Sequence, residues 1–143
     1  MNKTLGELQK QATAELSASS DSARLDADLI ICHALSISRT ALITQDRMVL
    51  KTEQLNQIQQ LIEKRKQSYP VAYITGSRHF WDLELKVTED TLIPRPETEL
   101  LVEMALSLFV EDQSIRVLDL GTGSGAIAVA IAKARPTWRI MAC

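Results

Sequence analysis

The sequence predicts a mixed α/β chain made of an all-α helical bundle at the N-terminus, a β-hairpin connector, and the first βαβ part of a parallel sheet. Three observations predict this order. Apolar residues recur at helical spacing before residue 67, they alternate with polar residues after residue 80, and a glycine-rich turn joins an apolar run to a helical stretch near the C-terminus. We expect a bundle over residues 1–69, a hinge and hairpin over 70–95, and the start of a further domain over 96–143.

Composition and charge narrow the class of protein. A hydrophobic content of 45% and a charged content of 24% are those of an ordinary globular chain. The net charge is −2, and no apolar run approaches the ~20 residues of a membrane helix, so we expect neither a nucleic-acid partner nor a membrane partner. The two isolated cysteines, Cys32 and Cys143, favour a reduced cytoplasmic protein over a disulfide framework. No side-chain group has metal-ligand spacing, so we predict no metal site.

The bundle is predicted from four amphipathic stretches with short connections. Thr4 and Glu7 form the pattern of a capping box, which marks a helix start. Asp26 and Asp28 point in different directions on their helix, and we interpret them as surface charges or as partners of Arg24. The expected helices cover residues 5–16, 23–35, 39–44 and 52–66.

A β-hairpin is predicted after the bundle. Pro70 and Gly76 bracket a segment that is neither clean helix nor clean strand, and we interpret it as a domain boundary. Apolar and polar residues then alternate over 81–87, which is typical of a half-buried strand. A turn at 88–90 and a returning strand at 91–93 complete the expected hairpin.

The next stretch has the composition of a helix start. Pro96 suits the first helical position, and Glu97 and Glu99 suit a helix N-terminus. Arg95 is less well explained, because it places a cation beside the positive end of a helix. A carboxylate on a ligand or on a neighbouring acid would offset that charge.

The stretch from 117 to 125 predicts a buried parallel strand, a glycine turn and a helix. Its glycines permit a ligand to approach the main chain, and the turn places free N–H groups at a helix N-terminus. Asp119 ends the strand, and a carboxylate buried there without a partner would cost roughly several kcal/mol. A cationic ligand group would satisfy it. A P-loop lysine is missing, and although Gly121, Gly123 and Ala126 match a dinucleotide fingerprint, Asp119 argues against that interpretation.

This pattern resembles motif I of the S-adenosylmethionine-dependent methyltransferases. Together with residues 70–76, Phe80-Trp81 and residues 91–99, it resembles the HemK/PrmC family of protein-(glutamine-N5) methyltransferases, which act on peptide chain release factors. The resemblance implies a helical substrate-recognition domain, a connecting hairpin and a Rossmann-like methyltransferase domain. Such an enzyme transfers a methyl group from S-adenosylmethionine to the glutamine of the release factor's Gly-Gly-Gln loop.

The resemblance also assigns cofactor-binding residues by position. A loop that lines the cofactor would comprise Asp119, Gly121, Thr122, Gly123, Ser124 and Gly125. A second segment would lie beside the methionine end of the cofactor, and it comprises Pro94, Arg95, Pro96, Glu97 and Thr98.

Two features of the family are missing from the sequence. One is the Asn-Pro-Pro-Tyr motif that grips the substrate amide, and the other is an acid for the ribose hydroxyls. A two-strand unit also leaves its apolar faces uncovered. We therefore expect the catalytic residues downstream of Cys143, and we interpret the chain as the front part of a longer protein that is inactive by itself.

The sequence is also compatible with other functions. The chain could belong to another amino-methyltransferase of the same fold that acts on a different protein or on a nucleic-acid base. The glycine spacing alone would allow an NAD-dependent oxidoreductase. A non-enzymatic helical docking module is also compatible, because the bundle is the only whole domain that the sequence predicts.

Overall fold

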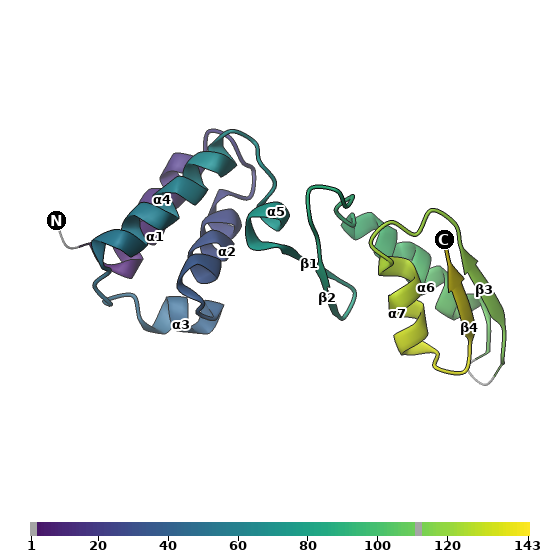
Figure 1. The fold of residues 1–143 in the computed structure, drawn as a ribbon. Coiled ribbons are helices and arrows are strands. Elements are labelled where there is room, and N and C mark those ends of the chain that lie inside the picture. Colours follow the sequence, from purple (N-terminus) through teal and green to yellow (C-terminus); the bar gives the residue numbers. More distant parts are fainter. Residues whose placement is uncertain (1–2, 111–112) are drawn as a thin grey trace. The chain divides into compact units, whose positions relative to one another are not determined.

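The computed structural model describes residues 3–110 and 113–143, and the chain divides into two compact units, Met1–Thr75 and Gly76–Cys143 (Figure 1). The first unit is helical, whereas the second combines helices with two small sheets. The predicted mixed α/β class is therefore confirmed.

Residues 3–75 of the first unit form five helices. The expected bundle helices form at the predicted residues, and each begins where local capping or periodicity places it. At α1, the Thr4 hydroxyl accepts a hydrogen bond from the Glu7 N–H, and the Glu7 carboxylate accepts one from the Thr4 N–H. A fifth, short helix lies inside the segment that we expected to be irregular, and it packs against α2. The helices are α1 (Leu5–Leu16), α2 (Ala23–Leu35), α3 (Arg39–Thr44), α4 (Thr52–Lys66) and α5 (Val71–Thr75).

The apolar core of this unit lies between α1, α2 and α4 (Figure 1). Side chains spaced three or four residues apart along each helix point into it, as the amphipathic pattern requires. The most deeply buried members, at no more than 1% exposure, are Leu5, Leu16, Ala27, Ile30, Ile31, Leu42, Ile58 and Ile62. The unit thus contains a core of its own.

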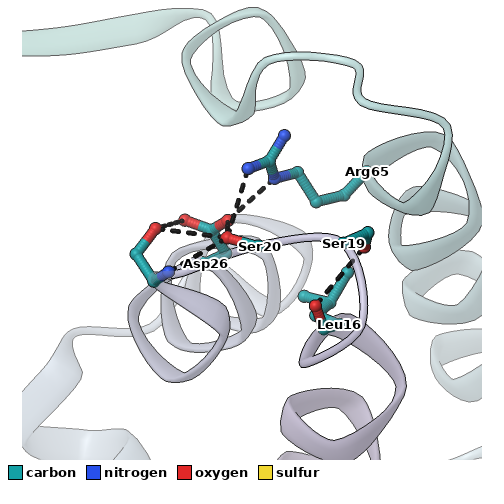
Figure 2. Close-up of polar contacts among 6 residues, drawn as sticks. Leu16, Ser19, Ser20, Asp26 and Arg65 are labelled. Atoms are coloured by element: carbon teal, nitrogen blue, oxygen red, sulfur yellow. Dashed lines mark hydrogen bonds and ion pairs between the residues drawn. The ribbon is translucent and has the colours of Figure 1, made fainter.

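Asp26 and Asp28 of α2 are both buried, so the prediction that they are surface charges is wrong. Asp26 accepts a hydrogen bond from Arg65 Nε on α4 (2.7 Å) and others from the hydroxyls of Ser20 and Ser22 (Figure 2). Asp28 does pair with Arg24, as the alternative prediction stated. A buried carboxylate needs such partners, and Asp26 finds its cation 39 residues away in the sequence.

The second unit opens with an antiparallel hairpin of β1 (Ser77–Phe80) and β2 (Leu83–Lys86), in which Phe80 faces Leu83. The predicted hairpin is therefore wrong in its pairing, because the first strand precedes Trp81 and residues 91–93 form no strand. Trp81 adopts a left-handed backbone with φ of 56°, which allows a two-residue turn at Trp81-Asp82. Burial of Phe80 at 1% exposure holds β1 in place.

The rest of the second unit forms a βαβ arrangement. The strands β3 and β4 are parallel, with Val117 opposite Ile140, and α7 connects them as predicted. The prediction that the first of these strands is buried is wrong, because Leu118 is 55% exposed. The helices α6 and α7 share a small apolar core, to which Phe80, Val102 and Trp138 contribute. The elements are the 3₁₀ helix η1 (Pro96–Thr98), α6 (Glu99–Leu108), β3 (Arg116–Asp119), α7 (Ala126–Ala134) and β4 (Arg139–Ala142). Across the described ranges, no helix is both long enough and apolar enough to cross a membrane.

Candidate functional site

The candidate site is the loop that links the carboxyl end of β3 to the N-terminus of α7. Gly121, Gly123 and Gly125 have φ values of 71°, 54° and 77°, a region that residues with a side chain rarely adopt. A Cβ added to Gly121 or Gly123 would meet no atom within 4 Å. The glycines are therefore required by the backbone turn, and the space beside the first two is open to a ligand.

Asp119 stands at the mouth of this loop as the last residue of β3. The Thr122 hydroxyl donates a hydrogen bond to Asp119 Oδ2 at 2.9 Å, which orients the carboxylate. Its other oxygen has no hydrogen-bond partner within the described ranges. A half-buried, oriented carboxylate with a free oxygen fits a ligand that offers an N–H or O–H donor, above all a cationic one.

The first two backbone N–H groups of the loop are already hydrogen-bonded. The N–H groups of Gly121 and Thr122 donate to the Cys143 carbonyl at 2.7 and 3.1 Å, and the Cys143 N–H donates to the Asp119 carbonyl at 3.0 Å. These bonds continue the ladder between β3 and β4 into the loop. The predicted free N–H groups belong to the N-terminus of α7, which begins at Ala126, so these two bonds do not test that prediction.

The second predicted segment, residues 94–98, lies before α6 in the same unit. The Thr98 N–H donates to the Arg95 carbonyl at 3.0 Å, which closes the 3₁₀ turn that starts at Pro96. The side chains of Arg95 and Glu97 are exposed. Among the described residues, no hydrogen bond or ion pair joins this segment to the glycine loop, and no carboxylate pairs with Arg95.

The turn of the hairpin is held by side chains whose role the sequence did not show. Glu99 Oε1 accepts a hydrogen bond from the Trp81 N–H at 2.8 Å. Lys133, near the end of α7, forms an ion pair with Asp82 at 2.7 Å and also donates to the Asp82 carbonyl. Glu99 was expected only as a favourable acid at a helix start. The contact between Glu99 and the hairpin depends on the left-handed turn at Trp81, which leaves the Trp81 N–H outside the hydrogen bonds between β1 and β2.

Other kinds of site find little support in this part of the molecule. The described ranges contain no group of three or more His, Cys, Asp or Glu residues that could hold a metal ion. The residues around the glycine loop instead suit a polar organic ligand, because they combine one carboxylate, one hydroxyl and open space beside the main chain.

Comparisons with known proteins relate the chain to one family. A family model described as the PrmC N-terminal domain matches residues 7–76, almost the same residues as the first unit. A release factor glutamine methyltransferase of Shewanella oneidensis is 46% identical over 138 residues, which is 96% of this chain and 48% of that protein. Those of Coxiella burnetii and Escherichia coli are 43% and 44% identical over 97% and 93% of the chain. The chain spans about half the length of these curated relatives.

Proposed function

Because this chain belongs to the PrmC family, we propose that it provides the helical domain and the start of the cofactor-binding domain of a release factor glutamine methyltransferase. The reaction is methylation of the side-chain amide nitrogen of the glutamine in the release factor's Gly-Gly-Gln loop. The observation that carries the proposal is the oriented Asp119 carboxylate beside an open glycine loop, in a chain about 45% identical to such enzymes.

The cofactor in this proposal is S-adenosylmethionine, which supplies an electrophilic methyl group when it is bound. The Asp119 carboxylate receives donors at the methionine end of the cofactor, and the Thr122 hydroxyl keeps that carboxylate in place. Gly121 and Gly123 leave room for the cofactor beside the main chain, in what we infer to be a Rossmann-like fold. Ser124 and Gly125 complete the loop, and the segment 94–98 would help to hold the methionine end of the cofactor.

The residues of the glycine loop do not account for how the glutamine amide of the substrate is positioned. An amide nitrogen is a weak nucleophile, so it must be held in line with the methyl group and oriented by hydrogen bonds. The 143 residues contain no Asn-Pro-Pro-Tyr motif for that task. We therefore expect no methylation of a release factor by this polypeptide alone, measured as transfer of a labelled methyl group. Measurable transfer would contradict that expectation.

The cofactor site can be tested by calorimetric titration of the chain with S-adenosylmethionine. Asp119→Asn removes the charge but keeps the shape, and we expect at least about tenfold weaker binding, because charge-assisted hydrogen bonds contribute about 1.5–3 kcal/mol. Glu103→Gln is the matched control, since it removes one exposed acid of α6 in the same unit. Equal affinity of the Asp119 variant and the wild type would reject the site.

A second candidate function is favoured by the separate core of the first unit. A helical domain that folds around its own core can dock a partner without any cofactor. The titration separates the two candidates. An absence of S-adenosylmethionine binding, combined with retained binding of a release factor, would favour the docking function for this chain.

A further inference from the structure

We propose that a hollow on the first unit docks an acidic segment of the protein substrate, which extends the proposed function and rests on it. The hollow has a volume of about 620 Å³ and lies where α1 ends and where α2 and α3 begin. Arg24 and Arg39 line it together with Leu25, Asp21 and several serines.

The two arginines are held in place by one buried carboxylate. Asp28, whose side chain is 10% exposed, accepts a hydrogen bond from Arg24 Nε at 3.2 Å and pairs with Arg39 Nη2 at 3.6 Å. Gln9 of α1 donates to the same carboxylate at 2.6 Å. Three helices therefore meet at Asp28, and both guanidinium groups are tethered before any partner arrives. Such preorganisation lowers the entropy cost of binding.

The tether leaves most hydrogen-bond donors of the arginines unused. Each guanidinium group has five N–H donors, and each contributes only one nitrogen to Asp28. The two side chains remain 60% and 61% exposed. Two cations pair with one anion here, so their remaining N–H donors can form hydrogen bonds with an acidic side chain of a partner.

Two acidic residues near the arginines, Asp26 and Asp21, affect how strongly an acidic partner can bind. Asp26 also lies on α2, but Arg65 and the hydroxyls of Ser20 and Ser22 already satisfy it. Asp21 is exposed in the lining and opposes an acidic partner. Its removal should therefore strengthen binding, whereas removal of either arginine should weaken it.

The chemistry of the lining favours a peptide over a nucleic acid. Leu25 is 42% exposed beside the arginines and offers an apolar contact to a side chain next to the acid. The lining contains no aromatic residue on which a base could stack, and the chain carries a net charge of −2. A short segment with an acid beside an apolar residue is the partner that fits.

The experiment measures binding of the 143-residue chain to a purified release factor and to the peptide Asp-Glu-Leu-Asp-amide, which carries fluorescein on its N-terminus. For the double variant Arg24→Gln and Arg39→Gln, we expect at least tenfold weaker binding of both probes. For Asp21→Asn we expect binding that is about threefold tighter. The matched control is Lys10→Gln with Arg47→Gln, which removes the same charge from exposed positions of the first unit, and it should bind within twofold of the wild type. Thermal melts identify variants that fail to fold, and the single arginine variants then replace the double one.

The remaining outcomes are equally informative. Unchanged binding in the arginine variants, or an equal loss in the control, would overturn the docking site while leaving the proposed function intact. Peptide binding that depends on the arginines, without any binding of the release factor, would keep the acidic docking site and reject the proposed partner. RNA that displaces the peptide at equal concentration would overturn the preference for a peptide.

Discussion

The two units of the chain differ in how completely they bury their apolar side chains. Among the residues that the structure describes, the large hydrophobic residues that remain exposed in the first unit are Leu25, Ile43 and Val49. In the second unit they are Leu92, Leu100, Leu101, Met104, Leu108, Phe109, Val110, Leu118, Leu120, Val129 and Met141. The helical unit therefore stabilises itself, whereas the unit that carries the glycine loop has a small core and apolar faces in contact with solvent.

This contrast can be measured, because the natural fluorophores separate the units. Both tyrosines, Tyr69 and Tyr73, belong to the first unit, and both tryptophans, Trp81 and Trp138, belong to the second. Tryptophan fluorescence therefore reports the second unit, while the far-ultraviolet helical signal is dominated by the first. We expect the tryptophan transition at a lower denaturant concentration than the helical one.

The largest expected effect comes from the same substitution made in each unit. Leu8 on α1 is 3% exposed, and Leu8→Ala should lower the free energy of unfolding of the first unit by about 2–5 kcal/mol through lost burial and a cavity. Leu101 on α6 is 54% exposed, and Leu101→Ala should change the second unit by less than about 1 kcal/mol. Urea titrations followed by both signals provide the values. Equal losses would show that the two units do not differ in packing.

A somewhat smaller effect is expected at the buried ion pair of the first unit (Figure 2). Arg65→Met leaves the Asp26 carboxylate with hydroxyl partners alone. Because Arg65 is still 19% exposed, we expect a loss of about 2–3 kcal/mol, below the full cost of breaking a buried pair. Asp26→Asn in the same background should recover part of that loss, since the uncompensated charge is gone. If the effects of the two substitutions on the free energy of unfolding were additive, the ion pair between Arg65 and Asp26 would not contribute to stability.

The glycine loop should respond more weakly and only in the second unit. Gly123→Ala places a side chain on a backbone with φ of 54°, which costs about 1–2 kcal/mol, although the added Cβ meets no neighbour. The tryptophan transition should therefore shift, while the helical transition of the first unit stays unchanged. A shift of both transitions would mean that the units unfold together.

The smallest effect concerns the capping box of α1. The backbone N–H of Thr4, followed by its hydroxyl, lowers the pKa of Glu7 below its ordinary value of 4.5. A carboxyl group whose pKa is lower in the folded state stabilises that state above the unfolded pKa, and this contribution is lost as the pH falls through the folded pKa. The small difference in melting temperature between the wild type and Glu7→Gln should therefore be present at pH 7 and vanish well below pH 4.5. A difference that is constant with pH would exclude a role for the charge.

Local patterns in the sequence were sufficient for four of the helices of the first unit and for the loop that marks the candidate site, whereas the short helix α5 was missed. The four bundle helices and the strand–glycine–helix order depend on capping, periodicity and glycine conformation, all of which act between residues a few positions apart. Asp119 could be singled out for the same reason, because its place at the end of a strand follows from the residues around it.

Only the tertiary structure decided which distant groups meet. The pairing of Asp26 with Arg65, of Arg39 with Asp28, and of Glu99 with the Trp81 N–H joins residues from different elements, and their sequence neighbours indicate none of these contacts. The hairpin register followed the burial of Phe80 and a left-handed turn, so alternation alone misplaced it. Periodicity tells which face of an element is apolar, but a buried charge or an unpaired N–H finds its partner only when packing brings the elements together.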